Sequence, residues 1–217
     1  MRLPLLAAIT GIGAVAAAGS MQRADQWTPT FAVEPGELHA TGRNPYFILE
    51  PGYQLVLADG SEQLVITVLG ETKLVDGVET RVVEERETKG GALVEISRNY
   101  YAISARTNSV FYFGEDVDMY TNGKVTSHDG AWHSGVNGAK FGLMMPGLPL
   151  LGARYYQEVA AKVAMDRAQI LTLGDSTLRT EETTPLEPGH TEYKQYRRGV
   201  GLIADGSLKF VRAGHVK

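Results

Sequence analysis

The sequence LVITVLGETKLVDGVETRVVEERETKGGALVEISRNYYAISARTNSVFYFGEDVD, residues 64–118, decides the fold. It contains four runs rich in β-branched and aromatic residues. Short turn signals separate these runs at Asp76-Gly77, Lys89-Gly90-Gly91 and Thr107-Asn108. Runs of this length with turns of this kind are typical of consecutive antiparallel strands. The centre of the chain is therefore expected to be a β-meander.

Similar, shorter runs lie on both sides of this meander. Tyr53–Leu57 precedes it, and Thr177–Thr184 and Glu192–Arg197 follow it. Residues 158–170 are compatible with a short helix or with strands, and we favour strands because the apolar residues do not share one helical face. The pattern predicts about ten to twelve strands and little helix. We therefore expect a mainly β fold, a single domain over residues 44–213 whose antiparallel strands form a strongly curved sheet or an open (half) barrel.

Residues 119–153 interrupt the strand pattern. They hold an Asn122-Gly123 hairpin signal, followed by closely spaced glycines and by Pro146 and Pro149. This density of glycine predicts a long, ordered, glycine-rich loop. Loops of this length within a compact domain are uncommon and often functional.

The N-terminus has the layout of an export signal. Residues 1–18 combine one arginine, an apolar stretch and a run of small residues, which predicts a secretory signal peptide, with an uncleaved anchor as the alternative. Residues 19–43 lack periodicity and are expected to form a linker or extended arm, either attached to the domain through Trp27 and Phe31 or mobile. No later stretch has the ~18 apolar residues of a membrane span. The mature chain is therefore expected to be exported, either periplasmic or secreted.

Composition excludes several classes of function. The chain has no cysteine, which excludes disulfides, thiol catalysis and the lipid-modified cysteine of a lipoprotein. The net charge of −4 gives no electrostatic footprint for nucleic acid. No dinucleotide, P-loop or zinc-protease motif is present. Ser134 does not lie in a Gly-x-Ser-x-Gly elbow, so no catalytic residue is predicted.

The central strands carry many charges. Glu84-Glu85-Arg86-Glu87 places one pair of charges on each face of its strand, since side chains alternate. Arg98 and the Glu115–Asp118 segment follow in the next two strands. Sequential pairing would bring these charges together, either as ion pairs on a solvated face or as the polar lining of a hollow.

Two metal hypotheses arise from the sequence. Asp116 and Asp118 project to one side of a strand and are the best candidates for a Ca²⁺ site, although the following residues match an EF-hand loop poorly. The second hypothesis is copper, suggested by His128, His133, Met144, Met145 and Met165, but the spacing between the two histidines fits no common motif. The alternatives are an acidic hairpin and ordinary packing.

Trp132, Tyr155 and Glu158 suggest an aromatic and polar pocket beneath the glycine-rich loop. The alternative is that Trp132 only anchors the loop to the core. With the carboxylates of the central strands, they make up the predicted ligand-binding residues. These are Glu115, Asp116, Trp132, Tyr155 and Glu158.

Three segments together resemble a group of uncharacterised, exported bacterial β-rich proteins. The segments are FYFGEDV at 111–117, GAWHSGVNGAKFGLMMP at 130–146, and ETTPLEPGHTEYKQYRRGVGL at 182–202. The resemblance extends over roughly residues 44–212 and implies export and a β-rich fold, but no activity. This chain departs from the group between Leu173 and Leu178, where similar sequences have a longer insertion shaped like a hairpin.

The favoured hypothesis is a non-catalytic binding protein of the bacterial envelope that holds a small or apolar ligand. A carrier or chaperone for lipid is one form of it, by analogy of fold alone. One alternative is an envelope hydrolase that uses carboxylates, which requires a deep pocket with a raised carboxyl pKa. Another is a structural or assembly protein that offers a strand edge to a partner.

Overall fold

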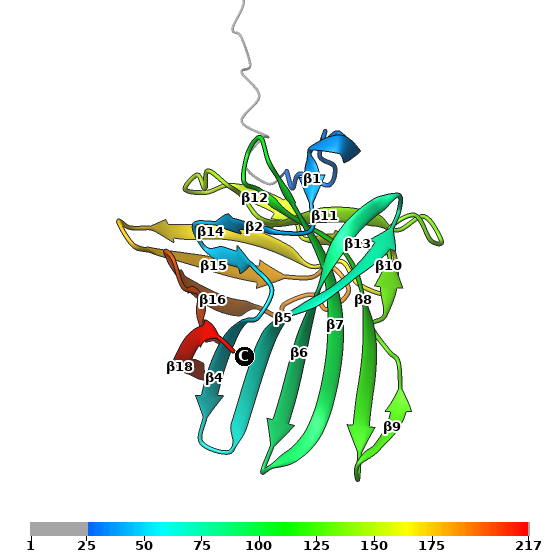
Figure 1. Cartoon of the computed structure of the whole chain (residues 1–217), viewed down its shortest axis with the longest axis vertical. Coiled ribbons are helices and arrows are strands. Elements are labelled where there is room, and N and C mark those ends of the chain that lie inside the picture. The colour runs from blue at the N-terminus through cyan, green and yellow to red at the C-terminus, as the bar shows by residue number, and fades with distance from the viewer. Residues whose placement is uncertain (1–25, 217) are drawn as a thin grey trace, which may run out of the picture.

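The computed structural model describes residues 26–216, and nearly all of this range is antiparallel sheet (Figure 1). The single helix in that range is a 3₁₀ turn, η1 (Pro35–Glu37). No helix within it has the length and hydropathy needed to cross a membrane. The prediction of one mainly β domain is confirmed. The predicted signal peptide, residues 1–18, lies outside the described residues.

The predicted meander is present and continuous. Its strands are β4 (Tyr53–Asp59), β5 (Glu62–Val75), β6 (Val78–Lys89), β7 (Ala92–Ser104) and β8 (Val110–Thr121), each paired with the next. The turn residues Asp76 and Gly77 both have positive φ angles, of 50° and 78°. Two-residue hairpin turns of this kind match the right-handed twist of the strands they join.

A second meander follows the first. Its strands are β14 (Arg167–Leu173), β15 (Thr177–Thr183), β16 (Glu192–Arg197), β17 (Gly201–Asp205) and β18 (Leu208–His215). A tight turn joins β14 and β15, and Leu173 pairs with Leu178 there. Strand β18 then pairs with β4, with Phe210 opposite Leu57, so the two meanders form one sheet.

Residues 154–159 nearly close this sheet into a barrel. Strand β12 (Arg154–Tyr156) pairs with β14 at one edge, and β13 (Glu158–Val159) pairs with β11 (Lys140–Met145) at the other. Gln157 joins them and is buried. The chain therefore spans the two edges, and the sheet is more closed than the half barrel that was one of the two predicted forms.

The glycine-rich segment is only partly a loop. It contains β9 (Lys124–Ser127), β10 (Trp132–His133) and β11, all of which pair with β8. Gly114 in β8 has a φ of 132°, and a Cβ there would collide with the backbone of Trp132 and His133. The segment was predicted as loop because its glycines were interpreted as turns, whereas Gly142 lies within β11, where the backbone of Tyr156 and Gln157 comes close.

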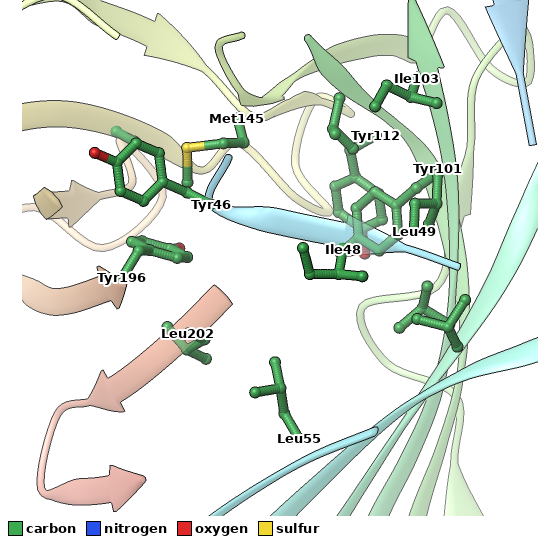
Figure 2. Close-up of a cluster of buried hydrophobic side chains, with 14 of the residues drawn as sticks. Tyr46, Ile48, Leu49, Leu55, Tyr101, Ile103, Tyr112, Met145, Tyr196 and Leu202 are labelled. Carbon is green, nitrogen blue, oxygen red and sulfur yellow. The ribbon is translucent and has the colours of Figure 1, made fainter. Parts of the chain in front are cut away.

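A short hairpin occupies the inside of the barrel. It consists of β2 (Gly42–Asn44) and β3 (Phe47–Leu49), which pair only with each other. Figure 2 shows Ile48 between the rings of Tyr101 and Tyr112 on one side and Tyr196 and Leu202 on the other, with Leu49 beside Tyr101. The hairpin therefore supplies the centre of the apolar core.

Asn44 fixes this hairpin to two distant turns. Its fully buried side chain donates hydrogen bonds to the carbonyls of Asn108 (2.7 Å) and Pro146 (3.1 Å), and accepts one from the Tyr46 amide (2.7 Å).

Asn44→Ala is expected to lower the free energy of unfolding by roughly 2–4 kcal/mol, because three buried backbone groups lose their partner. Urea denaturation monitored by circular dichroism measures the change. Arg43→Ala, which removes an exposed pair with Glu50, should cost under about 1 kcal/mol. Equal losses from the two variants would contradict this role for Asn44.

The arm over residues 26–41 lies on the outer face of the meander. Strand β1 (Leu38–His39) pairs with β7, and the Phe31 ring packs against Phe111 at 5.9 Å. Trp27 contacts Tyr156 edge-on at 6.4 Å. Both aromatic residues contact the domain, as the sequence suggested.

Candidate functional site

The barrel interior is apolar around the hairpin and acidic beyond it. Along β6, Val83, Glu85 and Glu87 alternate inward, and Glu85 lies opposite Ser97 of β7. Inward-facing acidic residues from the other strands meet in the same region. This carboxyl cluster consists of Glu85, Glu87, Glu95, Glu115, Glu158, Asp166, Glu182 and Asp205.

Burial raises the pKa of most of these carboxyl groups. The pKa of Glu85 is raised to about 7, first by burial and then by the charges of Asp205 and Glu87, while Lys194 lowers it in part. The pKa of Glu115 is raised to about 8, first by burial and then by Glu85. Both side chains are partly exposed, since they face the concave interior of the barrel and not a solid core. Protein atoms nevertheless surround them on most sides.

Lys194 on β16 is the one cation among these carboxylates in residues 26–216. Its Nζ lies 3.2 Å from Glu182 and 3.7 Å from Asp205. Burial alone would lower the pKa of Lys194, but these two carboxylates outweigh burial and hold the pKa well above its usual value. The lysine is therefore charged and compensates part of the surrounding negative charge.

Three buried polar atoms near the cluster lack a hydrogen-bond partner among the described residues. They are Glu158 Oε2, the Tyr155 hydroxyl and Trp132 Nε1, in side chains exposed by 6%, 3% and 6%. The Trp132 indole lowers the pKa of Glu158 in part, yet no hydrogen bond of normal geometry joins the two groups. Burial nevertheless raises that pKa well above its usual value. Buried polar groups without partners are rare in proteins and indicate room for water or a ligand.

A pocket opens between the hairpin and the carboxyl cluster. The empty space between its walls is about 580 Å³, including the part that opens to solvent, and the centre of a water molecule can occupy about 60 Å³ of it. Its polar end is formed by Glu85, Lys194 and Asp205. Its other walls are aromatic and aliphatic, with Tyr46, Phe47, Ile48, Tyr53, Leu55, Ile66, Val68, Val83, Met144, Tyr196, Gly201 and Leu202.

Four of the five predicted ligand-binding residues lie in or beside this interior. Glu115 and Glu158 belong to the carboxyl cluster, and Tyr155 and Trp132 belong to the adjoining core. None of the four lines the pocket itself. Whether they bind a ligand stays a prediction.

Asp116, the fifth residue, lies on the outer face of the barrel. Its carboxylate accepts hydrogen bonds from Lys73 Nζ (2.8 Å) and the Tyr100 hydroxyl (2.5 Å), and lies 2.9 Å from His133 Nε2. The structure therefore separates Asp116 from the other four.

Both aspartates of the calcium hypothesis have basic neighbours. Asp118 pairs with His128 at 2.9 Å, as Asp116 does with Lys73 and His133. Residues 26–216 contain no group of three acidic or histidine side chains arranged to hold a metal ion. Calcium binding at Asp116 and Asp118 stays a prediction.

The charged residues of the central strands form ion pairs on the outer face and also line the hollow interior, the two arrangements that the sequence suggested. Glu84 pairs with Arg98 across the outer face at 3.2 Å, as sequential strand pairing predicts. Glu85, the next residue, points into the barrel and lines the pocket. The alternation of Glu84 and Glu85 thus separates a solvated ion pair from a site residue.

A second groove lies beside Trp132 under the glycine-rich segment. The empty space between its walls is about 560 Å³, including the part that opens to solvent, and the exposed residues Val136 and Val163 line it. Tyr155 and Glu158, which were expected in this pocket, face the barrel interior instead. Trp132 stacks edge-on against Tyr112 at 5.4 Å, so it also anchors the segment to the core.

Sequence reasoning missed Lys194 and the hairpin as parts of the site, and it named Glu85 only as one of several charges for which the lining of a hollow was one of two interpretations. For Lys194 a signal existed, because Lys194 and Tyr196 share one face of a predicted strand. Nothing local marked that face as the inner one.

The fold and the site define a nearly closed antiparallel barrel with an acidic, partly hollow interior. Comparisons with family models, curated proteins and solved structures find no match to this chain. The resemblance to exported bacterial β-rich proteins stays a prediction.

Proposed function

We propose that the protein is an exported, non-catalytic binding protein that holds a small ligand inside the barrel. The observation that carries this proposal is the pocket between the hairpin and the carboxyl cluster. Its walls come from distant parts of the chain, are mostly apolar and have a few polar groups at one end. Pockets that bind small molecules have this composition, with polar groups that set the orientation of the ligand.

The size of the pocket limits the ligand. Its free space suits a compact aromatic molecule or a short chain, whereas a whole lipid would require the β2–β3 hairpin to move. The hydrogen bonds of Asn44 oppose such a movement. A small ligand is therefore favoured over the lipid-carrier form of the hypothesis.

The uncharged fluorescent probe N-phenyl-1-naphthylamine tests this proposal. Ile66→Trp adds bulk to the pocket wall and is expected to weaken probe binding at least tenfold. Val65→Trp is the matched control, because Val65 lies on the opposite face of the same strand and should leave binding unchanged. If Ile66→Trp does not fold, Leu202→Phe serves the same purpose. Equal binding by wild type and both pocket variants would overturn the proposal.

A carboxylate-dependent hydrolase is the second candidate, and one observation favours it. Glu85 lines the pocket with its pKa raised to about 7, as general acids near neutral pH require. Hydrolysis of a panel of small esters and glycosides that is lost in Glu85→Gln would support this candidate over simple binding.

A further inference from the structure

The polar end of the pocket has more acidic than basic groups around it. Glu85 and Asp205 of the carboxyl cluster line it directly, and the remaining members lie behind them or on adjoining strands. Lys194 is the one opposing charge among the described residues, and its ammonium group is already engaged by Glu182 and Asp205. A carboxylate or phosphate ligand would therefore meet net repulsion here, whereas a cation would be attracted.

The interior beside the pocket is also acidic. Glu158, 6% exposed, lies outside the pocket wall, and Glu115 and Asp166 lie close enough for their charges to raise its pKa. The Trp132 indole and the Asp166 backbone offset part of this rise in the pKa of Glu158. The carboxyl groups around the pocket therefore outnumber the lysine among them.

The pocket walls distinguish an organic cation from a bare metal ion. Tyr46, Tyr53 and Phe47 contribute ring surfaces, and aromatic faces attract ammonium groups and the hydrocarbon next to them. A hard metal ion instead needs several oxygen ligands converging at about 2.3–2.6 Å. Lys194 shows that carboxylates at this end accommodate an ammonium group, at 3.2 Å from Glu182.

We propose that the pocket binds a small organic amine, with its ammonium group facing Glu85 and Asp205 and its apolar body against the aromatic walls. This inference rests on the proposed binding function and specifies the chemical class of the ligand. The ammonium group donates hydrogen bonds to carboxylates, while the hydrocarbon displaces water from the apolar walls.

Three probes with the same body test this inference, namely 2-phenylethylamine, 2-phenylethanol and phenylacetate. Isothermal titration calorimetry measures the affinity for each probe at pH 8. At this pH most Glu85 side chains are ionised, because the pKa of Glu85 is about 7. We expect the amine to bind at least tenfold more tightly than the alcohol, and phenylacetate to bind more weakly than either.

Glu85→Gln and Glu84→Gln form the matched pair of variants. Glu85→Gln is expected to weaken amine binding at least tenfold and to leave alcohol binding unchanged. Glu84→Gln should change neither, because Glu84 faces outward and pairs with Arg98. Urea denaturation verifies that both variants fold.

The possible outcomes separate the two proposals. Alcohol or phenylacetate binding as tight as amine binding would overturn the amine assignment and leave the binding function standing. Stabilisation of the protein by CaCl₂, without binding of the amine, would also overturn the amine assignment. Failure of all three probes, together with binding of N-phenyl-1-naphthylamine that Ile66→Trp abolishes, overturns only the amine assignment. Failure of the naphthylamine test as well overturns both.

Discussion

The double variant Glu85→Gln, Glu115→Gln is expected to be more stable than wild type at pH 8, by roughly 2–4 kcal/mol or about 5–12 °C in melting temperature. Burial raises the pKa of Glu85 to about 7 and that of Glu115 to about 8, from an ordinary value of 4.5. The folded protein therefore holds these protons more strongly than the unfolded chain does. Glutamine retains the neutral form at every pH.

The sign of the pH dependence follows from these values. Below about pH 4.5 both carboxyl groups are protonated in the folded and unfolded states, and the full contribution to stability is present. As the pH rises towards 7–8, the unfolded chain has released its protons while the folded protein still retains them, so stability falls. Wild type should lose stability over this interval, and the double variant should lose much less.

Thermal denaturation between pH 5 and pH 8.5 measures this difference. Glu84→Gln is the control, since its partner Arg98 lies on the outer face, and it should not reproduce the effect. Parallel curves for wild type and the double variant would show that the two side chains are as solvated in the folded protein as in the unfolded chain.

Gly142→Ala is expected to cost roughly 2–4 kcal/mol of folding free energy, or to prevent folding. Gly142 lies in β11, where the backbone of Tyr156 and Gln157 crosses it, and an added Cβ would overlap those backbone atoms. Because the overlap is with backbone, no side chain can rotate to relieve it. The residues that close the barrel would have to move apart.

Gly70→Ala is the matched control in strand β5. No atom lies within 4 Å of a Cβ at that position, so the substitution should be neutral or slightly stabilising. Urea denaturation compares the two variants, and naphthylamine binding reports on the interior. A Gly142→Ala protein as stable as Gly70→Ala would mean that the β11–β13 junction is not tightly packed.

The meander was predictable because its information is local. Strand β6 begins after Asp76-Gly77 and ends before Gly90-Gly91, and these turn residues have the positive φ angles that such hairpins need. The inner face of β6 was not predictable. At one end of the strand both faces are apolar, because Phe31 and Leu38 of the arm cover the outside.

The site was predictable only in part, for a related reason. Glu115 was selected for its charge and Glu158 as the polar part of an aromatic pocket, and the structure places both in the barrel interior. Asp116 was selected with them, but alternation along β8 directs it outward. The role of Asn44 depends on contacts with residues 108 and 146, far away in the chain. Local patterns carry no information about such contacts.

The pairing of β18 with β4 has a consequence for the folding kinetics. Phe210 lies opposite Leu57, so the seam between the two meanders joins residues from nearly opposite ends of the domain. Strand β18 follows every other strand of the sheet in the chain, so its pairing with β4 requires the whole domain to have been synthesised. A topology with such high contact order folds slowly, since loop-closure entropy is lost before the long-range contacts form. During this delay the unpaired strands are exposed to aggregation, and a chaperone that holds the nascent chain would shorten that exposure.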